Sequence, residues 1–193
     1  QDLGCGRVAE DLGDGGEQVL VVDADLRRPQ QHDLFQVAGD VGLSEVLAGE
    51  VQPDDALAAT GIPNLTLLPA GRTPPNPSEL LGSKRMRALL KLASEDFFVI
   101  VDSPPLLPVT DGSLLATAVD GTVLVVRQGR TRKDPLEAAV ENLAAVDAHL
   151  LGVVMNGVAR SQRGGGYSYG YGYESTYHKS HDKYLQGTGT AGK

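Results

Sequence analysis

Five short apolar runs, rich in β-branched residues, alternate with segments of helical character along most of this chain. The runs cover residues 19–23, 65–68, 97–102, 121–126 and 150–155. Such runs are typical of buried strands in parallel sheets. Alternation of strands and helices in turn implies an α/β fold. We therefore expect a mostly parallel sheet with helices on both faces.

Glycine, proline and capping residues suggest where the intervening helices begin and end. A helix before the first strand is expected to close at Gly15-Gly16. Asn76-Pro77, with Glu79 three residues after the Asn, predicts a helix start, and we expect that helix to run to about Ala93. Asp134-Pro135 has the same character and predicts a helix before the last strand.

The pattern of strands and helices stops shortly after the fifth run. Residues 164–173 read Gly-Gly-Gly-Tyr-Ser-Tyr-Gly-Tyr-Gly-Tyr, a low-complexity stretch without apolar periodicity. The sequence thus predicts a folded domain over residues 1–159 and a flexible tyrosine-rich tail over residues 160–193.

Composition and charge exclude several classes of function. One cysteine excludes an internal disulfide framework and indicates a reducing compartment. The net charge is −8, and residues 160–193 hold five basic and two acidic residues, a net of +3, which leaves −11 for residues 1–159. So acidic a domain argues against nucleic-acid binding. We see no secretory signal and no apolar run near the ~18 residues of a membrane span.

Two of the predicted strands end in carboxylates. Asp23 and Asp25 lie at the end of the first strand, and Asp102 ends the third. Ligands of α/β sheets bind at the carboxyl ends of the strands. Carboxylates there are suited to holding Mg²⁺ and to orienting an attacking hydroxyl. A solvated loop with an N-cap aspartate is the competing interpretation for Asp23 and Asp25.

Two further features are open to chemistry. Asn156 follows the fifth strand, and its amide suits the edge of adenine, although it could equally be a turn residue before Gly157. All the tyrosines of the chain lie in the tail, and a pliable exposed segment can enter an active site. A tail that stacks on sugars or on other tails is the alternative. The tyrosines are Tyr167, Tyr169, Tyr171, Tyr173, Tyr177 and Tyr184.

Taken together, these elements resemble the bacterial tyrosine kinases that regulate capsule and exopolysaccharide synthesis, relatives of the MinD/ParA-type P-loop ATPases. Residues 19–29, Val-Leu-Val-Val-Asp-Ala-Asp-Leu-Arg-Arg-Pro, resemble the family's Walker A′ motif. Residues 99–105, Val-Ile-Val-Asp-Ser-Pro-Pro, resemble its Walker B motif. Residues 68–71 and 74–81 match a further family stretch, and the tyrosine cluster sets these kinases apart from partitioning ATPases.

The resemblance implies a P-loop NTPase-like fold and a role for each motif residue. Asp23, Asp25 and Arg27 would be catalytic, and Asp23, Asp25 and Asp102 would lie at Mg²⁺. Asp102 and Asn156 would contribute to binding of Mg·ATP, with Asn156 at the adenine. The six tyrosines would be phosphoacceptors, modified largely by neighbouring subunits.

The resemblance also implies partners and a location. The family works as a ring-shaped homo-oligomer with a membrane-spanning polysaccharide co-polymerase or activator, and with a cognate tyrosine phosphatase. It implies no nucleic-acid partner. The expected location is cytoplasmic, at the inner face of the cell membrane, through a partner or a missing N-terminal segment.

One departure from the family pattern concerns the phosphate-binding loop. No Gly-x-x-x-x-Gly-Lys-Ser/Thr occurs in the sequence. Truncation at the N-terminus, which the start at Gln1 favours, and degeneration of the motif are the two explanations. Either leads us to expect little or no ATP turnover by these 193 residues alone.

Two other functions remain open from the sequence. A MinD/ParA-like positioning ATPase would hydrolyse ATP without forming phosphotyrosine. A non-catalytic phosphoacceptor regulator of polysaccharide assembly would need a second enzyme for phosphorylation of its tail.

Overall fold

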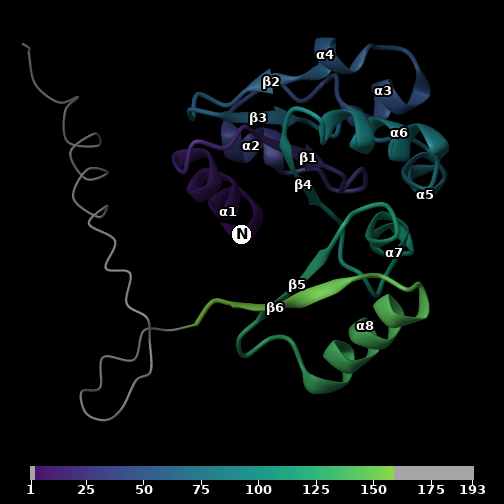
Figure 1. Cartoon of the computed structure of the whole chain (residues 1–193). Coiled ribbons are helices and arrows are strands. Elements are labelled where there is room, and N and C mark those ends of the chain that lie inside the picture. The colour runs from purple at the N-terminus through teal and green to yellow at the C-terminus, as the bar shows by residue number, and fades with distance from the viewer. Residues whose placement is uncertain (1–2, 159–193) are drawn as a thin grey trace, which may run out of the picture. The chain divides into compact units, whose positions relative to one another are not determined.

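The computed structural model describes residues 3–158, which form an α/β fold (Figure 1). The elements in chain order are α1 (Leu3–Asp14), β1 (Val19–Asp23), α2 (Gln31–Phe35), α3 (Leu43–Ala48), α4 (Pro53–Ala56), β2 (Ala58–Ala59), β3 (Leu65–Leu68), α5 (Pro77–Leu81), α6 (Lys84–Ala93), β4 (Phe98–Asp102), α7 (Asp111–Ala116), β5 (Thr122–Arg127), α8 (Lys133–Ala145) and β6 (Leu150–Asn156). Each of the five predicted strands is present.

The larger sheet has four strands in the order β2-β3-β1-β4. β1 pairs in parallel with β3 on one side and with β4 on the other. The two-residue β2 is antiparallel to β3. The sheet is therefore mostly parallel, as predicted, with β1 in its interior.

Helices cover both faces of this sheet because β1 alternates its buried side chains between them. Val19 and Val21 pack on the face that includes Ala9 of α1 and Phe35 of α2. On the opposite face, Leu20 and Val22 belong to a second core cluster. That cluster includes Leu43 of α3, Leu81 of α5 and Met86 of α6. All five residues of β1 are buried, which explains the continuous apolar run.

A second, two-stranded parallel sheet is formed by β5 and β6. Val126 of β5 is buried, as are Ala139 and Leu143 of α8. Val123 and Val125 are 50% and 55% exposed. Among the described residues, β5 has a strand neighbour, β6, on one side only. β4 likewise pairs only with β1. We expected a single sheet, whereas the described residues form two.

The predicted helix over residues 76–93 is two helices, α5 and α6, separated at Gly82 and Ser83. Asn76 precedes α5, but its side chain makes no capping hydrogen bond. The Ser83 hydroxyl instead accepts a hydrogen bond from the backbone N–H of Met86 and caps α6. The helix that we expected to start at Asp134-Pro135 begins slightly earlier. α8 starts at Lys133, with Arg132 at the N-cap.

The tail and all its tyrosines lie outside the described residues, so the domain boundary at residue 159 stays a prediction. Within residues 3–158, no helix combines the length and the apolar character that crossing a membrane requires.

Candidate active site

β1 and β4 end side by side, and each ends in an aspartate. Asp23 and Asp102 are register partners in the parallel pair. The backbone N–H of Ala24 donates to the carbonyl oxygen of Asp102 at 2.8 Å, which continues the pairing past the end of β1. The structure thus brings together the two strand ends on which the sequence prediction of a site depends.

The Asp23 side chain is completely buried and organises the loop that follows it. Its Oδ1 accepts a hydrogen bond from the backbone N–H of Asp25 at 3.2 Å. Its Oδ2 accepts from the N–H groups of Gln30 and Gln31 at 3.2 and 3.1 Å. Burial raises the pKa of Asp23 above its ordinary value, although these backbone hydrogen bonds oppose the rise. Asp23 therefore holds a proton more readily than an exposed aspartate does.

Asp25 is less buried than Asp23 and holds the next part of the same loop. Its Oδ1 accepts hydrogen bonds from the backbone N–H groups of Arg27 and Arg28 at 3.1 and 3.0 Å. Leu26, between Asp25 and Arg27, is 1% exposed and packs in the core, which anchors the loop. Asp25 is thus held beside Asp23 while part of its side chain stays accessible.

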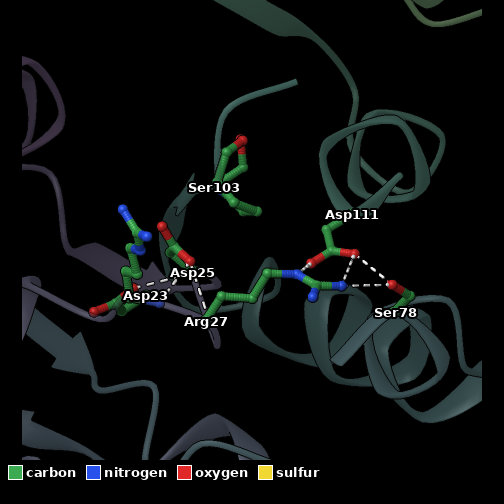
Figure 2. Close-up of polar contacts among 8 residues, drawn as sticks. Asp23, Asp25, Arg27, Ser78, Ser103 and Asp111 are labelled. Atoms are coloured by element: carbon green, nitrogen blue, oxygen red, sulfur yellow. Dashed lines mark hydrogen bonds and ion pairs between the residues drawn. The ribbon is translucent and has the colours of Figure 1, made fainter. Parts of the chain in front are cut away.

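Arg27 extends away from the two aspartates toward α5 and α7, as Figure 2 shows. Its Nε donates to Oδ2 of Asp111 at 2.7 Å, and its Nη2 donates to Oδ1 at 3.2 Å. The same Nη2 lies 3.0 Å from the Ser78 hydroxyl, which donates to Asp111 Oδ1 at 2.5 Å. Arg27 therefore ties the loop after β1 to two helices.

Asp111 is the buried centre of this cluster. Its side chain is completely buried, whereas that of Arg27 is 39% exposed. Burial alone would raise the pKa of Asp111, but hydrogen bonds from Arg27 and Ser78 outweigh burial and lower it. The hydrogen bond to Asp111 raises the pKa of Arg27. The sequence analysis did not single out Asp111, whose only local signal is its position at the start of α7.

A second residue that the sequence analysis missed, Gln31, contacts Asp102. Gln31 is 1% exposed, and its Nε2 donates to Asp102 Oδ2 at 2.5 Å. Its Oε1 is a buried side-chain oxygen without a hydrogen-bond partner among the described residues. Gln31 thus brings an amide group to the carboxylate that ends β4.

The donor set at these strand ends fits Mg²⁺ in one respect. No group of three or more His, Cys, Asp and Glu side chains within residues 3–158 could hold a metal ion by itself. Mg²⁺, however, is usually bound through one or two carboxylates, with several waters and substrate phosphates completing the shell. Asp102 and Asp23 offer carboxylate oxygens of this hard type, and the amide that contacts Asp102 adds the Gln31 oxygen without a partner among the described residues. The metal role of Asp23, Asp25 and Asp102 stays a prediction.

Asn156 belongs to the other sheet, at the end of β6. It is half-buried, and its carbonyl oxygen accepts a hydrogen bond from the N–H of Gln128 at 2.9 Å. Next to it, an open hollow of about 440 Å³ is lined by Arg127, Gln128, Arg130 and Gly157. Asn156 itself does not line this hollow, and its contact with adenine stays a prediction.

Comparison with known proteins identifies relatives across most of the chain. A scan against protein-family profiles finds no match. The tyrosine-protein kinase YwqD of Bacillus subtilis is 41% identical over 157 residues, which are 81% of this chain and 65% of YwqD. The tyrosine-protein kinase CpsD of Streptococcus agalactiae is 31% identical over 156 residues, or 80% of this chain and 67% of CpsD. For the tyrosine-protein kinase etk of Escherichia coli the match is 36% over 150 residues, 77% of this chain but 21% of etk.

Solved structures agree with these relatives. The kinase domain of the Escherichia coli tyrosine kinase ETK has a TM-score of 0.79 at 36% identity, covering 86% of this chain and 66% of that chain. The cell-division ATPase MinD of Pyrococcus furiosus has a TM-score of 0.64 at 25% identity, covering 78% and 64%.

Fold and strand-end carboxylates together place the chain in the class of MinD-like P-loop ATPases and their kinase relatives. Within that class, the chain belongs to the bacterial tyrosine kinase family. It spans about two thirds of YwqD and about one fifth of etk.

Proposed function

We propose that this chain forms the catalytic core of an ATP-dependent protein-tyrosine kinase that phosphorylates its own C-terminal tyrosines. The observation that carries the proposal is the pairing of Asp23 with Asp102 at adjacent strand ends, in a chain 41% identical to a tyrosine kinase. The phosphoacceptors are the six tail tyrosines between Tyr167 and Tyr184.

In the proposed reaction a tyrosine phenol attacks the γ-phosphorus of ATP. A bond forms between the phenolic oxygen and phosphorus, the bond from phosphorus to the ADP oxygen breaks, and ADP leaves. The phenolic proton passes to the Asp23–Asp25 pair, of which Asp25 is the more accessible. Arg27, bound to Asp111, keeps the loop that carries both aspartates in place.

Asp102 and Asp23 are the residues we propose for Mg²⁺, together with phosphate oxygens and water. Bound Mg²⁺ would neutralise charge on the transferred phosphoryl group. A Mycobacterium smegmatis synthase, solved with bound ATP analogue and magnesium, has a similar fold, with a TM-score of 0.65 at 26% identity. The proposed place of Asn156 is beside the adenine.

The phosphate-binding loop of the kinase is proposed to lie outside these 193 residues, since the sequence holds no P-loop motif. A P-loop follows a strand and precedes a helix. Within residues 3–158, both β4 and β5 have one edge without a strand neighbour. A parallel strand along such an edge could carry the loop to the carboxylates.

The biological setting is proposed from the resemblance to the family. The kinase would regulate capsule or exopolysaccharide synthesis and export at the inner face of the cell membrane. Its partners would be a membrane-spanning co-polymerase or activator, further copies of itself in a ring, and a cognate tyrosine phosphatase.

The test is phosphotyrosine formation by the full gene product that contains this chain. We expect incubation with Mg·ATP to add phosphate to the tail tyrosines, and a variant with all six tyrosines changed to Phe to gain none. Intact-mass measurement with peptide mapping counts the phosphates. ATP hydrolysis without any phosphotyrosine would instead support a positioning ATPase.

A further inference from the structure

Gln31 donates hydrogen bonds to both strand-end aspartates. Its backbone N–H donates to Asp23 Oδ2 at 3.1 Å, and its side-chain Nε2 donates to Asp102 Oδ2 at 2.5 Å. The Gln31 side chain is 1% exposed, whereas Asp102 is half-buried. Gln31 therefore fixes the two carboxylates relative to each other.

The Gln31 amide has a defined orientation. Its NH₂ group faces Asp102 and donates to Oδ2, so its carbonyl oxygen faces the other way. That oxygen, Oε1, is buried and without a partner among the described residues. Buried acceptors in native proteins are nearly always satisfied. A donor that is not part of residues 3–158 is therefore expected at Oε1.

We propose that Gln31 is a positioning residue of a divalent-cation site, and that Oε1 accepts a hydrogen bond from a water bound to the cation. This inference rests on the proposed function, since the cation is the one that Asp102 and Asp23 would hold. Mg²⁺ gives up its waters reluctantly and keeps several of them when bound to protein. A cation also makes its bound water a stronger hydrogen-bond donor. A neutral acceptor beside a carboxylate suits such a water.

The role predicts a metal affinity that depends on Gln31. The probe is Mn²⁺ with ADP, added to the full gene product that contains this chain, and binding of the ion to the protein is followed by electron paramagnetic resonance. We expect Gln31→Met, which keeps the length of the side chain and removes both polar ends, to bind Mn²⁺ about tenfold more weakly. The matched control is Gln30→Met. Gln30 is exposed, and its contact with Asp23 is through the backbone N–H. The Gln30→Met variant should therefore bind Mn²⁺ as tightly as the unaltered chain does.

A second measurement does not depend on the folding of a variant. In the unaltered chain, the side-chain NH₂ resonances of Gln31 should broaden on addition of Mn²⁺ at concentrations that leave those of Gln52, exposed and outside this loop, sharp. Absence of this selective broadening would overturn the inference.

The outcomes separate this inference from the proposed function. Equal Mn²⁺ affinity of Gln31→Met and the unaltered chain would overturn the inference alone. Mn²⁺ binding that depends on Gln31, in a gene product that forms no phosphotyrosine, would uphold the inference and overturn the kinase proposal. An unaltered chain that binds no Mn²⁺ would overturn both this inference and the proposed metal site, while leaving phosphotyrosine formation to be decided by its own test.

Discussion

Asp111 shows how a single buried charge can determine the position of a loop near a candidate active site. Its carboxylate accepts hydrogen bonds from Arg27 and Ser78, residues that lie in the loop after β1 and in α5. A carboxylate that is fully buried must find such partners, because an unpaired buried charge is strongly destabilising. The Arg27 guanidinium is thus engaged in holding the loop. We therefore infer that Arg27 acts on the proposed reaction indirectly, by positioning the loop that carries Asp23 and Asp25.

This pairing predicts a pH-dependent loss of stability. The folded-state pKa of Asp111 is lowered, so its contribution is present above the unfolded pKa of about 3.9 and is lost as pH falls through the folded value. We expect Asp111→Asn to reduce the free energy of unfolding by about 1–2 kcal/mol at pH 7, and by less at pH 3. Urea unfolding at both pH values measures the difference.

The control for this prediction is Asp40→Asn, since Asp40 is exposed. It should change the free energy of unfolding little at either pH. A destabilisation by Asp111→Asn that is the same at pH 3 and pH 7 would contradict the proposed ionised state of Asp111.

The residue scale also separates what the sequence predicts from what it does not. Asp23 and Asp102 could be found because each ends an apolar run, and the ends of parallel strands meet at one edge of a sheet. Gln31 and Asp111 could not. Their partners, Asp102 and Arg27, lie 71 and 84 residues away in the sequence, and no local pattern records a contact of that range.

At the scale of elements, the break between α5 and α6 depends on which residue caps a helix. Asn76 has the residue type of an N-cap, but its Nδ2 donates to Glu79 Oε2 at 2.5 Å and its oxygen makes no capping hydrogen bond. Ser83 makes the capping bond with Met86 N–H at 3.1 Å. The sequence signal at Asn76 thus marked a helix start correctly, while the later start at Ser83 was hidden inside a continuous helical pattern.

Capping therefore predicts an order of stabilities. Ser83→Ala removes the hydrogen bond to the N–H of Met86 and should lower the free energy of unfolding by about 1 kcal/mol. Asn76→Ala is the matched variant, and it should cost less because no capping bond is lost. Urea unfolding of the two variants compares them directly, and a larger loss for Asn76→Ala would contradict the assignment of the cap.

At the scale of the whole molecule, the alternation of strands and helices was enough to predict the α/β class and helices on both faces. It was not enough to predict which strands pair. β1 pairs with β3 and β4, and β5 pairs with β6 in a separate sheet. Such pairing depends on contacts between segments distant in sequence, which a local pattern does not record. The exposed Val123 and Val125 of β5 are unusual for a parallel sheet, which is normally covered on both faces.

The central claim is that the carboxylates at the ends of β1 and β4 direct phosphate from ATP onto the tail tyrosines. The most direct measurement is the number of phosphates on Tyr167–Tyr184, by intact mass and peptide mapping, after incubation of the full gene product with Mg·ATP. Asp23→Asn is compared with the unaltered protein and with Asp33→Asn, whose side chain is 84% exposed. We predict phosphotyrosine in the unaltered protein and in Asp33→Asn, and a rate at least about a hundredfold lower in Asp23→Asn. Phosphorylation of Asp23→Asn at the unaltered rate would contradict the account.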